Sequence, residues 1–436
     1  MPLLSLRTGK LCIATLFVFA CNTGCISHND DLVRIQNEIR TAGEPLTFED
    51  LNAFSALPEG AENAAQIYQQ AFDAWVKDEA LENRMLTTGW HYVTDVPGLG
   101  EPLSGDLLTA ARDYTNLNRR TIDLLVKASQ QPHFRIPVDY TRAEPTDVVV
   151  LAWLANLKRS TRLITEQAYV YIAEHQAERA ADMVLTIFRF ADHTQQTPEI
   201  LCLLYGNGFD ANAYELLDEL RAITPLSSQS LGRLTSAIHA DSEPEGFTRA
   251  MLAERVLINE ILSGNTQVFS DYIKLPSVPD PNKTRHHANA LTAATKFIDD
   301  NSRMNTPAYT LSKERTSIDP DPYDWSEDDL MFLNYNALQQ ARAKRRATLT
   351  ALAADRYRLD HNTFPTALGQ LTPDYLDAIP EDPFNPGHLL KLTTAPHGIT
   401  IYSIGPDQAD DGGLKDLDIV SRSFTTPGIK QPVPQP

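Results

Sequence analysis

The chain has 436 residues, of which 42% are hydrophobic and 22% charged, and this is enough for roughly two or three globular domains. A formal charge of -19 makes the chain a poor candidate for non-specific nucleic-acid binding, which requires a basic face, so we expect no nucleic-acid partner. The acidity also argues against a polybasic membrane-surface site, and no apolar run reaches the ~20 residues of an ordinary membrane span.

Two basic residues, Arg7 and Lys10, precede an apolar stretch at residues 11–21. This order is typical of a secretory signal peptide, which we predict over residues 1–20. The stretch ends at Ala20-Cys21 and resembles a bacterial lipoprotein signal, in which the cysteine after a small residue is lipidated. Cys21 is the preferred lipidation site and Cys25 the alternative, while plain secretion or an uncleaved anchor stays open. The signal predicts an extracytoplasmic protein anchored to a membrane by lipid, in the periplasm or on the outer membrane face.

Helical periodicity dominates residues 21–300, where we expect a helical-repeat-like domain. Successive helices with short connections favour stacked hairpins, arranged either as an α-solenoid or as an irregular bundle. Cys202 lies in an apolar run, so we expect it to be a small buried hydrophobe. The expected helices cover approximately residues 31–42, 61–76, 107–129, 147–175, 178–193, 199–223, 227–240, 247–262 and 287–300.

A polar, proline-containing stretch at residues 301–325 is predicted to be a linker or a surface excursion. A long helix is expected next, from Ser326 to about Asp360, because Ser326 and Asp329 have the spacing of a helix N-cap with its reciprocal acid. The basic triplet Lys344-Arg345-Arg346 falls in the middle of this helix, so we expect that the helix does not lie in lipid.

Two short β-like runs, at residues 388–394 and 399–404, follow the long helix and predict a hairpin. We therefore assign residues 326–424 to a small α+β module built from the long helix and these strands. Residues 425–436 are rich in proline and are predicted to be a flexible tail.

The acidic stretch after the hairpin is a candidate calcium site. It contains Asp407, Asp410, Asp411, Asp416 and Asp418, with glycines that permit tight turns. Carboxylates this close repel one another without a cation, and calcium accepts oxygen ligands in loose geometry. The alternative is a solvated acidic loop that binds no metal.

Four motifs follow one another in a characteristic order, and the last of them opens the acidic stretch. The motifs are Tyr357-Arg358-Leu359-Asp360, Phe364-Pro365, Asp382-Pro383-Phe384 and Tyr402-Ser403-Ile404-Gly405-Pro406-Asp407. Together they resemble the globular part of the major pseudopilin of type II secretion systems. The resemblance covers residues 351–419 and implies a calcium-binding loop. Its preferred ligands are Asp407, Asp416, Asp418 and the carbonyl of Ile404, with Asp410 and Asp411 as weaker matches.

The rest of the chain departs from the pseudopilin family. The Gly-Phe-Thr-Leu-x-Glu prepilin segment is absent from the sequence, so we do not expect a pilus subunit. The whole chain also looks like envelope lipoproteins of planctomycete-type bacteria, a resemblance that implies no particular activity.

Motifs of common enzyme classes are missing from the sequence. It has no phosphate-binding Gly-x-x-x-x-Gly-Lys, no Gly-x-Ser-x-Gly nucleophile elbow and no His-Glu-x-x-His. We expect the pair His286-His287, together with His175 and His193, to lie on helix surfaces.

These observations predict a mainly α fold, with irregular helical hairpins followed by a small α+β module that resembles a pseudopilin. The predicted function is a lipid-anchored interaction or structural protein of the cell envelope, with calcium in its C-terminal module. Its partner would be an envelope protein of unknown identity, and the module would dock on secretion or cell-surface machinery. The alternative is an envelope hydrolase whose site lies between helices.

Overall fold

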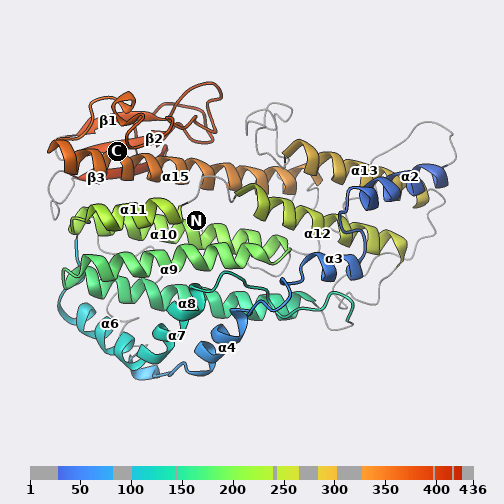
Figure 1. The fold of residues 1–436 in the computed structure, drawn as a ribbon, viewed down its shortest axis with the longest axis horizontal. Coiled ribbons are helices and arrows are strands. Elements are labelled where there is room, and N and C mark those ends of the chain that lie inside the picture. The colour runs from blue at the N-terminus through green and yellow to red at the C-terminus, as the bar shows by residue number, and fades with distance from the viewer. Residues whose placement is uncertain are drawn as a thin grey trace.

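A computed structural model shows a predominantly helical chain with a three-stranded antiparallel sheet near the C-terminus, which confirms the predicted fold class (Figure 1). The structure describes residues 28–81, 101–142, 146–238, 243–264, 283–301, 327–395, 398–414 and 417–424. The helices are α2 (His28–Thr41), α3 (Phe48–Phe54), α4 (Ala65–Asp73), α6 (Gly105–Leu117), α7 (Arg119–Ser129), α8 (Thr146–Ala173), α9 (Ala177–Gln196), α10 (Ile200–Ile223), α11 (Ser228–Ala237), α12 (Glu243–Ser263), α13 (Lys283–Asn301), α15 (Glu327–His361) and the short 3-10 helix η1 (Leu368–Leu371). The strands are β1 (Lys391–Ala395), β2 (Gly398–Ser403) and β3 (Ile419–Phe424).

Some predicted segments lie outside the described residues. They are the signal peptide with Cys21 and Cys25, residues 302–325 and the tail at 425–436. What the sequence predicts for them therefore stays a prediction. Among the helices that the structure describes, none is both long enough and apolar enough to cross a membrane.

Helix α9 lies at the centre of the helical body, where α7, α8, α10, α11 and α12 pack against it (Figure 1). Buried side chains occur on most sides of α9, as expected of a helix that other helices surround. In a solenoid each repeat contacts only its neighbours in sequence. The packing around α9 therefore makes this body an irregular bundle. The short turn predicted between α8 and α9 is present, with His175 at a φ of 56°.

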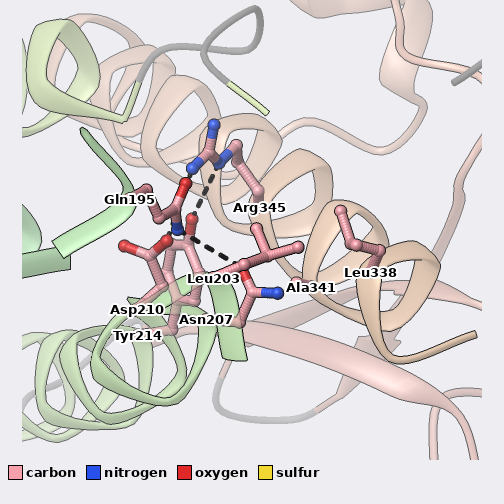
Figure 2. Close-up of a pocket in the computed structure, with 8 residues that line it drawn as sticks. All are labelled: Gln195, Leu203, Asn207, Asp210, Tyr214, Leu338, Ala341 and Arg345. Atoms are coloured by element: carbon pink, nitrogen blue, oxygen red, sulfur yellow. Dashed lines mark hydrogen bonds and ion pairs between the residues drawn. The ribbon is translucent and has the colours of Figure 1, made fainter. Parts of the chain in front are cut away.

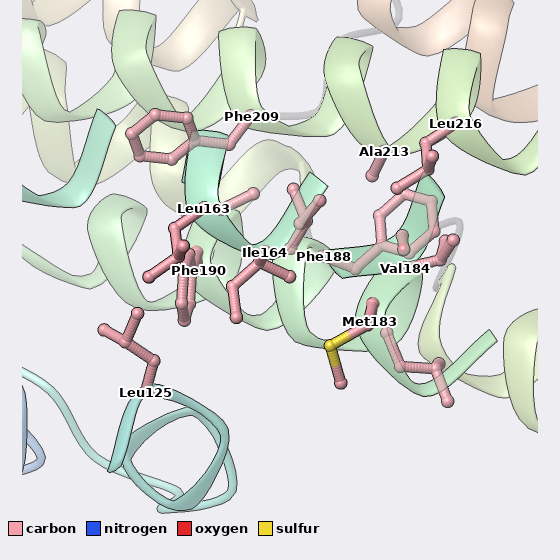
Figure 3. Close-up of a cluster of buried hydrophobic side chains, with 14 of the residues drawn as sticks. Leu125, Leu163, Ile164, Met183, Val184, Phe188, Phe190, Phe209, Ala213 and Leu216 are labelled. Carbon is pink, nitrogen blue, oxygen red and sulfur yellow. The ribbon is translucent and has the colours of Figure 1, made fainter. Parts of the chain in front are cut away.

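The main hydrophobic core fills the space between α8, α9 and α10 (Figure 3). Ile164 from α8, Phe188 from α9 and Phe209 from α10 are all buried there. Each such side chain contributes about 1.5–3 kcal/mol when it leaves water. Cys202 belongs to the same cluster, which confirms its prediction as a buried hydrophobe. Leu352 of α15 also joins it, so the C-terminal helix shares a core with the bundle.

The predicted helix at residues 107–129 is in fact two helices, α6 and α7, and Asn118 lies between them. The Asn118 side chain is buried and contacts the backbone of Val76, accepting from its N–H at 2.9 Å and donating to its carbonyl at 3.3 Å. This contact comes from a distant part of the chain. Periodicity within 107–129 could not reveal it.

Helix α3 was not predicted, although its capping signal is present in the sequence. The Thr47 hydroxyl accepts from the Asp50 N–H, and the Asp50 carboxylate accepts from the Thr47 N–H at 3.0 Å. This reciprocal pair is a capping box, which satisfies backbone donors at a helix start. The spacing of Thr47 and Asp50 was the available signal.

Hydrogen bonds and an ion pair from polar side chains of α12 hold the segment between α2 and α3 against that helix. Arg255 is fully buried, forms an ion pair with Glu44 at 2.7 Å and donates to the Pro45 carbonyl. Asn259 donates to the Leu46 carbonyl at 2.9 Å. Breaking such buried polar contacts would leave groups unpaired at a cost of about 1–3 kcal/mol each. The N-terminal helices are therefore fixed to the body of the protein.

The expectation that His193 and His287 lie on helix surfaces is wrong, because both side chains are buried. His193 Nε2 lies 2.8 Å from the Gln131 carbonyl, which can only accept, so Nε2 carries the proton. Its Nδ1 then accepts from the Tyr68 hydroxyl at 2.9 Å. Burial lowers the pKa of His193 to about 4, so the ring is neutral near pH 7.

The C-terminal module consists of the sheet, η1 and the second half of α15, which packs on β2 and β3. Strand β2 is central and antiparallel to both neighbours. Small side chains on α15, including Ala347, Ala351 and Ala354, pack with Ile399 and Ile401 of β2. Alanine at these positions lets the helix backbone approach the sheet closely.

Candidate metal centre

The acidic loop, residues 404–418, joins β2 to β3 and brings its two ends together. Ser403 pairs with Ile419 in the sheet, so Ile404 and Asp418 occupy the next position along both strands. Gly405 has a φ of +72°, and a Cβ there would lie 2.9 Å from the Leu417 carbonyl oxygen. A larger residue at position 405 would therefore clash with the returning chain.

The Ile404 backbone is held by Asp382, from the Asp-Pro-Phe motif. The buried Asp382 carboxylate accepts from the Ile404 N–H at 3.0 Å, from the Ser403 hydroxyl at 2.5 Å and from the Phe384 N–H at 2.9 Å. Three donors satisfy this charge, so Asp382 acts as a fixed support. It positions the backbone whose carbonyl was predicted to be a calcium ligand.

Asp418 is the most unusual carboxylate of the loop. Its side chain is buried, and its Oδ2 accepts from the Gly413 N–H at 2.7 Å. Its Oδ1 is also buried and has no hydrogen-bond partner among the residues that the structure describes. Burial raises the pKa of Asp418, the backbone N–H groups of Gly413 and Asp411 oppose this effect, and the nearby charges of Asp411 and Asp410 add to it. The site thus holds a carboxylate oxygen that lacks a compensating donor.

Asp410 differs because it is already neutralised. It forms an ion pair with Lys391 of β1 and accepts from the Tyr402 hydroxyl at 3.1 Å. The Lys391 ammonium holds the pKa of Asp410 below its ordinary value. Burial, reinforced by the bond to Asp410, raises the pKa of Tyr402 to about 12. Asp410 is therefore less suited than Asp418 to receive a metal ion.

The remaining predicted ligands are placed less closely. Asp407 is exposed, and its carboxylate accepts from the Ala409 N–H at 3.1 Å. Asp411 is half-buried and lies near Asp418, while Asp416 lies outside the described residues. Among the described residues, no three His, Cys, Asp or Glu side chains are grouped so as to hold a metal. The structure thus places Ile404 beside Asp418 and brings the charges of Asp411 and Asp410 near Asp418, while Asp407 lies at the surface.

A second set of carboxylates forms a buried seam between α10 and the C-terminal module. Arg221 of α10 pairs with Asp355 of α15 at 2.7 Å and with Asp218 at 3.0 Å. Lys344 of α15 also pairs with Asp218, at 2.8 Å. The Ser421 hydroxyl of β3 donates to Asp218 at 3.0 Å. We call these five residues the buried seam; two cations neutralise its two carboxylates.

Lys344 and Arg345 of the basic triplet attach α15 to neighbouring elements of the protein. Besides its ion pair, Lys344 donates to the Val420 carbonyl of β3 at 2.6 Å. Arg345 is buried, donates to the Tyr214 hydroxyl at 3.2 Å and lies 3.5 Å from the Asp210 carboxylate. The charges in the middle of the helix therefore fasten α15 to α10. This role could not be derived from the triplet alone.

The space beside Arg345 is a small polar cavity between α9, α10 and α15 (Figure 2). Gln195 donates to the Asn207 Oδ1 across it at 3.3 Å, and the Asn207 Nδ2 has no hydrogen-bond partner within the described part of the chain. The cavity volume is about 10 Å³, comparable with the space of one water molecule. It is too small for an organic substrate and does not support a hydrolase site at this place. Its lining residues are Gln195, Leu203, Asn207, Asp210, Tyr214, Leu338, Ala341 and Arg345.

Comparison of the chain with protein-family models, with curated proteins and with solved structures gives no match. The site is therefore interpreted from its own geometry. Sequence reasoning missed three participants in these clusters, Asp382, Lys391 and Arg221. The Asp-Pro-Phe motif was a signal for Asp382, whereas nothing local distinguishes Lys391 or Arg221 from surface cations.

Proposed function

We propose that the protein is a lipid-anchored interaction or structural protein of the cell envelope, with a C-terminal module that calcium stabilises. The anchor rests on the charged and apolar order before Cys21. The structural role is supported by the buried seam, which joins the module firmly to the helical body. Both parts would move as one unit and present a fixed surface to an envelope partner.

The observation that carries the calcium proposal is the buried, unpartnered Oδ1 of Asp418. A divalent cation would neutralise Asp418 together with the nearby Asp411, and calcium prefers such oxygen ligands. The carbonyl of Ile404 is held beside Asp418 by Asp382 and could supply a neutral oxygen. Asp407 and Asp416 are the further proposed ligands, with Asp410 contributing less because Lys391 already neutralises it.

Thermal unfolding of the full chain with calcium, magnesium or chelator tests the metal. We expect calcium to raise the melting temperature and magnesium to substitute poorly, because magnesium demands tighter octahedral geometry. Asp418→Asn should remove the response, whereas the matched loop variant Asp410→Asn should retain most of it. A melting temperature that ignores millimolar calcium would leave a solvated acidic loop.

Incorporation of radiolabelled palmitate in a bacterial host tests the anchor. The wild-type chain should be labelled, and replacing Cys21 and Cys25 together with serine should abolish the label. Cys202→Ala is the control, since this buried thiol should contribute nothing. Label that persists in the double variant would exclude both predicted sites.

A further inference from the structure

Three helix ends meet at one tip of the molecule. Asn259 of α12 accepts a hydrogen bond from Gln36 of α2 at 3.3 Å and lies 3.0 Å from His287 of α13. One turn earlier on α12, Arg255 reaches Thr295 of α13. Helices α12 and α13 are therefore antiparallel, so the end of α12 lies beside the start of α13.

The start of α2 reaches the same tip. Gln36 lies opposite Asn259, whereas Glu44, further along the chain, lies opposite Arg255. Chain direction along α2 is thus opposite to that of α12, and residues before Gln36 extend toward the end of α12. We call this meeting point of the start of α2, the end of α12 and the start of α13 the α2 tip.

The α2 tip is far from the C-terminal module. Gly206 of α10 and Gly246 of α12 both lie against Gln195, where a Cβ on either would clash with that side chain. From Gly206 to Arg221 in the seam, α10 extends about 22 Å, and α12 extends about 26 Å from Gly246 to its end at Ser263. From Gln195, α10 therefore leads to the seam beside β3, and α12 leads to the α2 tip. The tip and the sheet accordingly lie at opposite ends of the longest axis (Figure 1).

The predicted lipidation sites lie immediately before α2. His28, where the helix starts, is the seventh residue after Cys21 and the third after Cys25. Extended chain spans at most about 25 Å or 11 Å over these lengths. Arg255 and Asn259 bind the backbone of the α2–α3 segment, so α2 is held in place and the chain after it adds no length to the link between the lipid and the protein.

We infer that the α2 tip faces the lipid bilayer and that the C-terminal module points away from it. The inference rests on the proposed lipid anchor and adds an orientation to it. The formal charge of -19 opposes an orientation in which the long side lies flat on an anionic bilayer. In the upright orientation the acidic loop lies in the aqueous phase, beyond the negative surface potential, and exchanges calcium with the bulk solution.

Resonance energy transfer from the protein to labelled lipid tests the orientation. The lipidated full chain is reconstituted into vesicles of phosphatidylethanolamine and phosphatidylglycerol that contain an acceptor on a lipid headgroup. A donor is attached at Val33→Cys in α2 or at Leu389→Cys in the module; the two positions are 48% and 50% exposed. The non-acylated member of the Cys21 and Cys25 pair is replaced by serine, and buried Cys202 stays unreactive.

Transfer should be several-fold more efficient from position 33 than from position 389. Equal transfer from both positions would mean that the protein lies flat, and stronger transfer from position 389 would mean the reverse orientation; either result overturns the inference. Flotation of the vesicles reports the anchor separately. Protein that fails to float with lipid would overturn the anchor, and the orientation with it, whereas protein that floats with equal transfer leaves the anchor intact.

Discussion

Asp218 in the buried seam and Asp418 in the acidic loop are both enclosed carboxylates, but they differ in the cations around them. Asp218 contacts Arg221 at 3.0 Å and Lys344 at 2.8 Å. Asp418 has only backbone N–H groups, those of Gly413 and Asp411, and the charges of Asp410 and Asp411 lie nearby; its buried Oδ1 has no hydrogen-bond partner in the described part of the chain. Within the described residues, the seam supplies its own cations, whereas Asp418 lacks one.

The comparison shows that a cluster of acidic residues acquires meaning only when its neutralising partners are known. The partners of Asp218 lie on α10 and on α15, 126 residues further along the chain. Asp410, inside the loop, is neutralised by Lys391. We therefore assign the seam to structure, and we assign the remaining unbalanced charge at Asp418 to an external cation.

The largest expected effect comes from breaking the seam. Arg221→Leu leaves Asp355 buried without its cation and removes one of the two cations that pair with Asp218. This change should lower the free energy of unfolding by about 3–5 kcal/mol. Denaturant unfolding of the full chain measures this loss. An effect below that of an ordinary surface ion pair would show that the seam does not hold the module.

The second-largest expected effect is the stabilisation by calcium bound at Asp418. Calcium at about a hundredfold excess over its Kd should stabilise the folded chain by about 2.7 kcal/mol. Because burial raises the pKa of Asp418, the folded calcium-free protein binds more protons than the unfolded chain in the range between the ordinary and the raised pKa. Its stability therefore falls as pH rises through that range, and protons compete with calcium below it.

The pH dependence of the calcium effect follows from this competition. The stabilisation by calcium should be smaller at about pH 4 than at about pH 7.5, as measured by denaturant unfolding with calcium or chelator. Asp418→Asn should lose both the calcium effect and its pH dependence. A calcium effect that is equal at both pH values would argue against a titrating carboxylate ligand.

His193 is a third buried titratable group, and unlike the two aspartates it is neutral near pH 7. Burial lowers its pKa to about 4 in the folded protein, so the unfolded chain binds more protons below pH 6.5. Stability should therefore fall as pH decreases, by about 2 kcal/mol between neutral pH and about pH 5. His193→Gln should flatten this dependence, whereas His388→Gln, at an exposed site, should not. Equal pH profiles for both variants would contradict the assignment.

The smallest expected effect belongs to an exposed ion pair. Arg233 of α11 pairs with Asp182 of α9 at 2.6 Å, and both side chains are largely exposed. Arg233→Leu should change the free energy of unfolding by about 1 kcal/mol or less. This variant is the control for Arg221→Leu under the same denaturant. A loss as large as that from Arg221 would remove the distinction between buried and exposed pairs.

Much of the fold could be predicted from periodicity and from the positions of proline and glycine. The hairpin of α8 and α9 follows from two long apolar patterns with almost no connection between them. Strand β3 was missed because its buried positions include Ser421 and Ser423, which sequence reasoning treats as polar surface. Both serines accept from Arg221 of α10 and so face the seam. Burial of polar residues against a distant helix leaves no local pattern.

The candidate site could be predicted only in part. The spacing of aspartates and glycines located the acidic loop, but the role of Asp382 in holding the Ile404 backbone was not predicted, although its Asp-Pro-Phe motif was noted. The sequence could not separate Asp410 from Asp418, because the difference depends on Lys391 from β1 and on burial. For Lys344 the sequence indicated only that its helix does not lie in lipid, because the partner Asp218 belongs to the distant α10. Pairings between remote segments set the electrostatics of both clusters.

Equilibrium dialysis of the full chain against radioactive calcium tests the central claim most directly. We predict one calcium ion per chain near neutral pH, with a Kd on the order of 10⁻⁴ to 10⁻³ M. Binding should disappear in Asp418→Asn and persist in the surface control Asp182→Asn. Absence of binding in the wild-type chain, or unchanged binding in Asp418→Asn, would contradict the assignment of the unbalanced charge at Asp418 to a metal site.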